Sequence, residues 1–185
     1  MKKRIPRFAA VAFAVTLLMC FSMPGNAATS DNAIVTVTSG STLTASILGG
    51  NFGATTYSFS DSAPLNGTII IRAVDARGTA PGWHVTIKGA DFAGQATSRT
   101  FPIGKLSLAA GTSAWVSPYG NSSVAGLTAS AITPVTTSFT QIWSAAAGSG
   151  DGVYDLTIPG SIVVPGGTRV DQYWALLTVS IDAGP

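Results

Sequence analysis

The sequence contains very few of the residue types on which most catalytic and metal sites are built. Among 185 residues there is one histidine, His84, one cysteine, Cys20, and no glutamate. This inventory excludes metal sites made of His and Cys clusters, and Ser-His-Asp triads built on any histidine other than His84. We therefore expect a protein that is not an enzyme and that needs no cofactor.

Charge is also scarce, since charged residues make up 10% of the chain. Four of the ten basic residues lie within residues 2–7, ahead of an apolar run. The rest of the chain then carries six basic residues and eight aspartates, a net charge of about −2. No basic patch is left to neutralise nucleic-acid phosphates or anionic lipid head groups, so nucleic-acid binding is excluded.

The first 27 residues have the layout of a secretory signal. Basic residues are followed by the apolar run 8–21, which is too short to span a membrane, and then by Pro24 and small residues. We expect cleavage after Ala27 or Ala28, no membrane span afterwards, and secretion to the cell surface. A lipid anchor on Cys20 is disfavoured because the bulky Met19 precedes it. The processed domain, residues 28–185, then folds without disulfides.

The remainder of the chain has the pattern of an all-β protein. Apolar residues alternate with Thr, Ser or His in several short runs, and Gly, Pro, Asp and Asn separate them at turns that include Pro159-Gly160. This predicts one antiparallel β-sandwich or jelly-roll-like domain. The continuous apolar run 68–74 is predicted as its central strand, and residues 109–126 as a long loop or irregular edge segments. The alternating runs are 34–38, 43–47, 57–59, 83–87, 106–108 and 177–181.

Several polar and aromatic residues leave two interpretations open. Trp83 is expected to anchor the core more readily than to contact a ligand. His84 is expected to be an ordinary sheet-surface residue, and Asp75 with Arg77 a surface ion pair of little energetic value. Trp115 and Tyr119 could bind a ligand but more commonly would cap the open end of a sandwich.

The aspartates suggest two further functions. Asp151, Asp155 and Asp171 could bind extracellular calcium, although their spacing fits no compact loop of oxygen ligands. A glycosidase would need a pair of aspartates, and no pair is marked out by the sequence. Neither function is favoured.

Two blocks of the chain resemble the WxL-domain family of secreted surface proteins of Gram-positive bacteria. The first contains Asp75-Ala76-Arg77-Gly78 and Gly82-Trp83-His84-Val85-Thr86, and the second ends in Leu177-Thr178-Val179-Ser180-Ile181. The resemblance places the family's two motifs at Trp83 and Val85, and at Val179 and Ile181, where Val179 stands in place of the second tryptophan. The literal Trp174-Ala175-Leu176 lies five residues earlier and is interpreted as coincidental.

The resemblance implies a protein that is attached noncovalently to the cell wall. Its partner would be peptidoglycan or another wall glycan, and other surface proteins are possible partners too. Trp83, Val85, Val179 and Ile181 are the candidate wall-binding residues. The alternative function is a self-assembling surface or pilus-type subunit, in which strands of adjacent copies complement one another.

Overall fold

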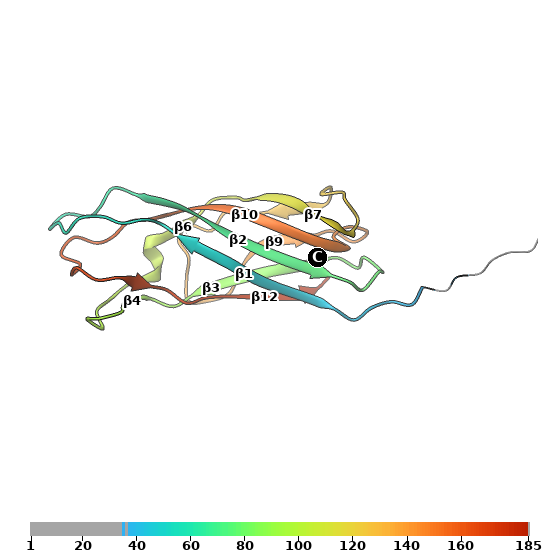
Figure 1. Ribbon diagram of the computed structural model, residues 1–185, viewed down its shortest axis with the longest axis horizontal. Helices are drawn as coiled ribbons and strands as arrows, with labels where there is room; N and C mark the ends of the chain where they lie inside the picture. Colours follow the sequence, from blue (N-terminus) through green and yellow to red (C-terminus); the bar gives the residue numbers. More distant parts are fainter. Residues whose placement is uncertain (1–34, 36, 185) are drawn as a thin grey trace, which may run out of the picture. The chain divides into compact units, whose positions relative to one another are not determined.

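The computed structural model describes residues 35 and 37–184 (Figure 1). The predicted signal at residues 1–27, with Cys20, lies outside the described residues, as do Ile34 and Thr36. From Val37 onward the chain forms one unit built almost entirely of strands in antiparallel sheets. This architecture confirms the predicted all-β, sandwich-like fold.

The larger sheet is built around the longest strands of the chain. Strand β10 pairs with β2 on one side, and with β7 and then β6 on the other, while β1 pairs with the far side of β2. The bounds of these strands are β1 (Leu43–Asn51), β2 (Leu65–Asp75), β6 (Leu106–Leu108), β7 (Thr112–Gly120) and β10 (Gly152–Ile162).

A second sheet has the strand order β12-β3-β9-β8, and a small third sheet has the order β11-β4-β5. Strand β1 comes close to β12, and β7 to β8, so the two main sheets approach each other at both edges. The bounds are β3 (Trp83–Gly89), β8 (Leu127–Ala129), β9 (Thr140–Ala145) and β12 (Leu177–Ala183), with β4 (Phe92–Gly94), β5 (Thr100–Phe101) and β11 (Tyr173–Trp174) in the third sheet. A short 3-10 helix, η2 (Ile103–Lys105), precedes β6.

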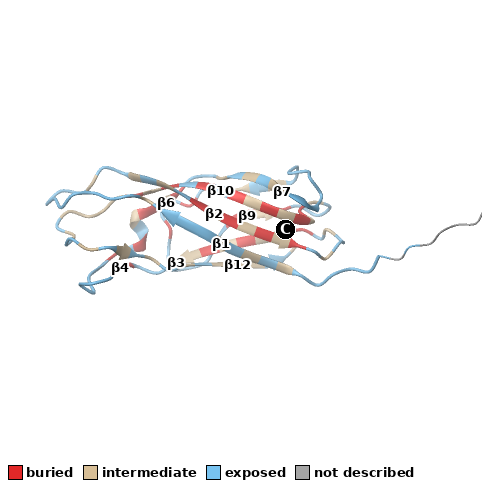
Figure 2. Cartoon of the chain, viewed as in Figure 1, coloured by how far each residue is buried: buried red, intermediate tan, exposed pale blue. Residues whose placement is uncertain are grey.

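The core lies between the two main sheets, where the inward residues of four long strands meet (Figure 2). Burial alternates along β2, β3 and β10, as expected for strands with one face turned to the core. The side chains with almost no exposed surface include Ile71 of β2, Trp83 and Val85 of β3, Trp143 of β9 and Tyr154 of β10.

Strand β2 is central, as predicted, because it pairs with β1 and β10 over most of its length. Its outer face is not fully buried, however, and this corrects the expectation of burial on both faces. Arg72 on that face forms a bidentate pair with Asp155 of β10, with both nitrogen–oxygen distances 2.8 Å. Because two nitrogens of the Arg72 guanidinium are bonded to a carboxylate, Arg72 can occupy the half-exposed face of a central strand.

Three sequence predictions are wrong for the described residues. Val35, and residues 37 and 38, belong to no strand, and residues 57–59 belong to none either. The expected turn at Pro159-Gly160 is absent, because β10 runs straight through both residues. Pro159 accepts a hydrogen bond from the Ala109 amide, at the position where β6 ends and β7 has not begun. The missing N–H of proline therefore falls at a gap in the neighbouring strands.

No helix in the described part of the chain is long and apolar enough to cross a membrane.

Candidate functional site

The four residues that the family resemblance singled out lie on facing strands of the second sheet. Ile181 pairs with Val85, and Val179 pairs with Ile87, in the β12–β3 register. The side chains of Trp83 and Val85 are completely buried, whereas Val179 and Ile181 are half-buried at the edge of the core. Trp83 and Val85 therefore expose no surface that a wall polymer could contact in this conformation.

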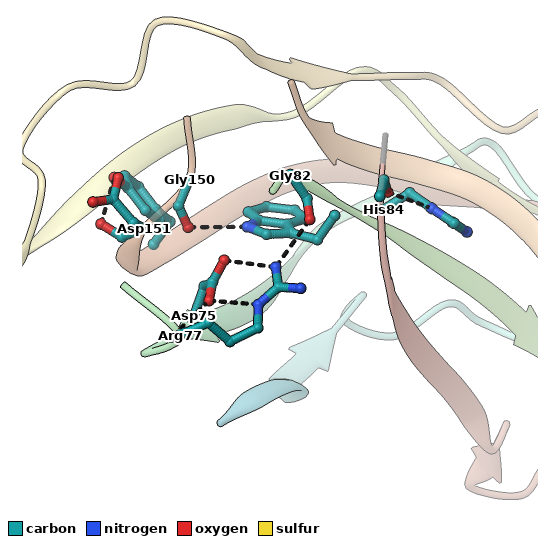
Figure 3. Close-up of polar contacts among 9 residues, drawn as sticks. Asp75, Arg77, Gly82, His84, Gly150 and Asp151 are labelled. Carbon is teal, nitrogen blue, oxygen red and sulfur yellow. Dashed lines mark hydrogen bonds and ion pairs between the residues drawn. The ribbon is translucent and has the colours of Figure 1, made fainter. Parts of the chain in front are cut away.

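The Trp83 ring is fixed by both polar and aromatic contacts. Its Nε1 donates to the Gly150 carbonyl at 3.0 Å (Figure 3). Its ring also packs edge-on against Trp143, with ring centroids 4.8 Å apart and an interplanar angle of 81°. The hydrogen bond satisfies the only polar atom of a large apolar side chain, which is what makes full burial of a tryptophan favourable.

Asp75 and Arg77 form a buried ion pair (Figure 3), and this corrects the predicted surface pair. The Asp75 side chain has no exposed surface, and Arg77 retains 14%. Arg77 Nε and Nη2 donate to the Asp75 carboxylate at 2.9 and 2.8 Å, and Nη2 also donates to the Gly82 carbonyl at 2.9 Å. Burial raises the pKa of Asp75, but the hydrogen bonds and charge of Arg77 outweigh it, so the net pKa is lowered.

The remaining polar residues singled out by the sequence have local structural contacts. His84 lies on the outer face of β3, and its Nδ1 is 3.0 Å from the Gly184 carbonyl. Asp155 pairs with Arg72, and Asp171 accepts hydrogen bonds from the turn at Ala96 and Thr97. Among residues 35 and 37–184, no group of three His, Cys, Asp or Glu side chains has the geometry to hold a metal ion.

Residues 109–126 contain a nine-residue strand, β7, rather than only loop. Trp115 is half-buried opposite Tyr154, and its Nε1 donates to the Tyr119 carbonyl at 2.6 Å. Tyr119 itself is 59% exposed. Trp115 therefore helps to cover the core, while Tyr119 lies at the surface near the start of β10.

An open cavity of about 1120 Å³ lies where β10 ends. The Trp83 ring lies at the other end of β10, since its partner Gly150 comes just before that strand begins. Two chain segments line the cavity, residues 49–58, which begin in the last part of β1, and residues 168–175, which contain β11. Ligand pockets typically have volumes of roughly 300–1,000 Å³, so this cavity has room for a ligand of several rings.

The floor of the cavity is apolar and largely aromatic. Phe92 and Phe101 stack with centroids 4.5 Å apart, and Tyr173 packs against Phe101 at 5.2 Å. Ile69 of β2 and Ile162 of β10 complete the floor from the larger sheet. Core residues themselves form this floor, so the cavity lies directly against the hydrophobic core.

Backbone and side-chain hydrogen bonds hold the segments beside the cavity together. The Gly167 amide donates to the Ser58 carbonyl at 2.8 Å, and the Gly166 amide donates to the Asp61 carboxylate at 2.9 Å. These bonds join the first cavity segment to the chain that leads into the second. The loops beside the opening are thus cross-linked by at least two polar contacts.

Asp171 fixes the second segment to the β4–β5 turn. Its carboxylate accepts hydrogen bonds from the Thr97 hydroxyl at 2.6 Å and from the Thr97, Ala96 and Gln172 amides at 2.7 to 3.1 Å. Together these donors lower the pKa of Asp171 to about 2, and the Thr97 hydroxyl makes the largest contribution to this shift. The ionised Asp171 carboxylate therefore holds the segment that carries Trp174 against the β4–β5 turn.

Two exposed aromatic residues line the cavity, and the sequence analysis did not select either of them. Tyr57 is 50% exposed and Trp174 is 62% exposed. The lining also carries hydroxyl and amide side chains, among them Thr55, Thr56 and Gln172. The only sequence signal was the literal Trp174-Ala175-Leu176, whose Trp174 and Leu176 are both exposed. We define Tyr57 and Trp174 as the aromatic rim.

The chain was compared with protein-family models, with curated proteins and with solved structures, and none of these comparisons found a match.

Proposed function

We propose that this protein is a non-catalytic cell-surface protein that binds a wall glycan, peptidoglycan being the expected partner, through the aromatic rim of the cavity. The observation that carries the proposal is the exposed pair Tyr57 and Trp174 beside a cavity lined with hydroxyl and amide groups. Aromatic rings offer large rigid apolar surfaces to the C–H faces of sugar rings, and the polar groups around them can orient the sugar hydroxyls.

Export and noncovalent attachment belong to the same proposal. They are supported by the signal-like residues 1–27 and by the resemblance of residues 75–86 and 177–181 to the WxL-domain motifs. A secreted domain with no cysteine after Cys20 depends on its core for stability. The protein would then be located at the cell wall, and it would be attached there by binding to glycan.

In this proposal the motif residues support the rim instead of contacting the ligand. Trp174 is the last residue of β11, and two residues separate it from the start of β12. Val179 and Ile181 fix β12 against β3 through their partners Ile87 and Val85. An anchored β12 limits how far the chain at Trp174 can move, so substitutions in the motifs would affect binding by displacing the rim.

The proposal is tested by pelleting the purified protein with isolated wall sacculi. Trp174→Ala and Tyr57→Ala should each weaken pelleting at least tenfold, because interface aromatics commonly contribute more than about 1.4 kcal/mol. Tyr119→Ala is the matched control, since Tyr119 is equally exposed but belongs to β7, which pairs with the start of β10. A soluble glycan fragment should compete with the wild-type protein. Undiminished pelleting of both rim variants would refute the proposed site.

A further inference from the structure

Most basic side chains in the described part of the chain are engaged by contacts within the protein. Arg72 pairs with Asp155, Arg77 with Asp75 and Lys105 with Asp61, and the Lys88 amine lies 4.5 Å from the centroid of the Phe139 ring. The guanidinium groups of Arg99 and Arg169 form no ion pair with any described residue. Because the chain after residue 28 has more aspartates than basic residues, two arginines without an acidic partner are unexpected.

Of these two arginines, only Arg169 lines the cavity that carries the aromatic rim. It is the only basic residue among the described residues of the lining, and its side chain is exposed. Arg99 is also exposed, but it lies at the end of the β4–β5 turn and outside the lining. The cavity therefore contains one cation that is open to a ligand.

The backbone at Arg169 is held in place from both sides. The Tyr173 hydroxyl donates to the Arg169 carbonyl at 3.0 Å, and the Tyr173 ring packs against Phe101 in the cavity floor. On the other side, the amide and the hydroxyl of Thr168 donate to the Pro165 carbonyl at 3.2 and 2.6 Å. The guanidinium thus starts from an anchored backbone and keeps five N–H donors for a ligand.

The acidic residue of the lining, Asp171, offers little to a ligand in comparison. Its two carboxylate oxygens already accept hydrogen bonds from the Thr97 hydroxyl and from the Ala96, Thr97 and Gln172 amides. A ligand in the cavity would therefore meet an anion whose acceptors are in use and a cation whose donors are free. This asymmetry favours a ligand that brings its own acceptors and negative charge.

We propose that the glycan bound in this cavity carries an anionic group, a carboxylate or a phosphate, and that Arg169 binds this group. A guanidinium presents parallel N–H donors that match the two oxygens of either group. Tyr57 and Trp174 would contact the sugar rings of the same ligand. The inference rests on the proposed function and adds the charge of the ligand to it. A neutral glycan would leave the charge of Arg169 without a counter-charge.

The first test compares charge variants in the pelleting experiment with isolated wall sacculi. Arg169→Gln keeps a polar side chain but removes the charge, and it should raise the dissociation constant at least about fivefold. Arg99→Gln is the matched control, because it removes the same charge from an exposed arginine outside the cavity, and it should pellet like the wild-type protein. Raising the salt concentration from about 0.05 M to about 0.5 M should reduce the difference between wild type and Arg169→Gln, since salt screens exposed ion pairs.

The second test identifies the anion by changing the sacculi. Amidation neutralises their carboxylates, and hydrofluoric acid removes polymers that are attached through phosphodiester bonds. Arg169→Gln should no longer weaken pelleting with the sacculi that have lost the relevant anion, because wild type then has no charged partner to lose. The treatment that removes the effect tells a carboxylate from a phosphate. Trp174→Ala should still weaken pelleting with the same treated sacculi.

Three results would overturn the inference. One is equal weakening by Arg99→Gln and Arg169→Gln, which would show an effect of net charge alone. Another is an Arg169→Gln effect that is as large after both treatments as before, since the arginine would then contact a neutral group. The third is undiminished pelleting of Arg169→Gln while Trp174→Ala and Tyr57→Ala lose binding. This third result would leave the proposed function standing, whereas undiminished pelleting of all three variants would refute the proposed site as well.

Discussion

Two tryptophans near the motif segments have opposite environments, although their sequence contexts look alike. Trp83 is completely buried, with its Nε1 bonded to Gly150, whereas Trp174 is 62% exposed beside the cavity. Both are followed two positions later by an aliphatic residue. The difference arises from the strand that carries each ring, since β3 is central and β11 belongs to a small peripheral sheet.

Replacing each tryptophan with alanine should separate stability from binding. Trp83→Ala should lower the free energy of unfolding by about 3–5 kcal/mol, as large-to-small changes in cores do. Trp174→Ala should change it by less than about 0.5 kcal/mol, because the ring is mostly exposed. Urea unfolding followed by circular dichroism measures both. Equal losses would contradict the assignment of Trp83 to the core.

At the scale of elements, the β9–β10 connection determines how the Trp83 ring is held. Gly148 and Gly150 in this connection both have positive φ, +81° and +80°. A Cβ on Gly148 would meet nothing within 4 Å, but one on Gly150 would lie 2.6 Å from Trp83 Nε1 and 2.5 Å from the Ala145 side chain. Only Gly150 is therefore required for close packing as well as for backbone conformation.

Replacing Gly148 and Gly150 separately with alanine gives two comparable variants, because both glycines have nearly the same positive φ. Gly148→Ala should destabilise the protein by about 1–2 kcal/mol, the cost of a side chain in the left-handed region. Gly150→Ala carries that cost and should lose about 1–3 kcal/mol more, because the added methyl group overpacks the core beside Trp83. The difference between the two melting curves measures the packing contribution. A smaller loss for Gly150→Ala would show that the turn can move away from the ring.

At the scale of the whole molecule, three aspartates are held ionised by their contacts. The pKa of Asp61 is lowered by the Gly166 amide and by Lys105, that of Asp171 falls to about 2 through Thr97 and neighbouring amides, and that of Asp75 is lowered by Arg77 despite its burial. In the unfolded chain these carboxyls have their ordinary pKa near 3.8. Their stabilising effect is therefore complete above about pH 4 and is lost as the pH falls toward 2.

Acid unfolding should follow from this arrangement. The free energy of unfolding should fall steadily between about pH 4 and pH 2, because the unfolded chain takes up protons before the folded one does. Asp75→Asn should be less stable at neutral pH, since it leaves Arg77 without its buried partner. The free energy of unfolding of this variant should also fall less steeply between about pH 4 and pH 2. Urea titrations at several pH values measure both quantities, and an unchanged slope would show that Asp75 does not contribute.

Much of the fold could be predicted from local pattern, because alternation is a local property of a strand. The runs at 43–47, 83–87, 106–108 and 177–181 all lie within observed strands. Residues 57–59 alternate equally well but belong to a loop beside the cavity. Alternation alone does not provide a partner strand, so it could not distinguish these cases.

The sequence by itself determined that the chain forms antiparallel strands, and it placed Trp83 and Val85 in one strand and Val179 and Ile181 in another, because side-chain periodicity and turn residues act over short distances. Only the tertiary structure paired these two strands. Tertiary structure decided what is accessible. Sheet stacking buried Asp75 and Trp83, and two distant segments came together around a cavity with Tyr57 and Trp174 beside it. Exposure depends on which surfaces meet, and those contacts join residues far apart in the chain.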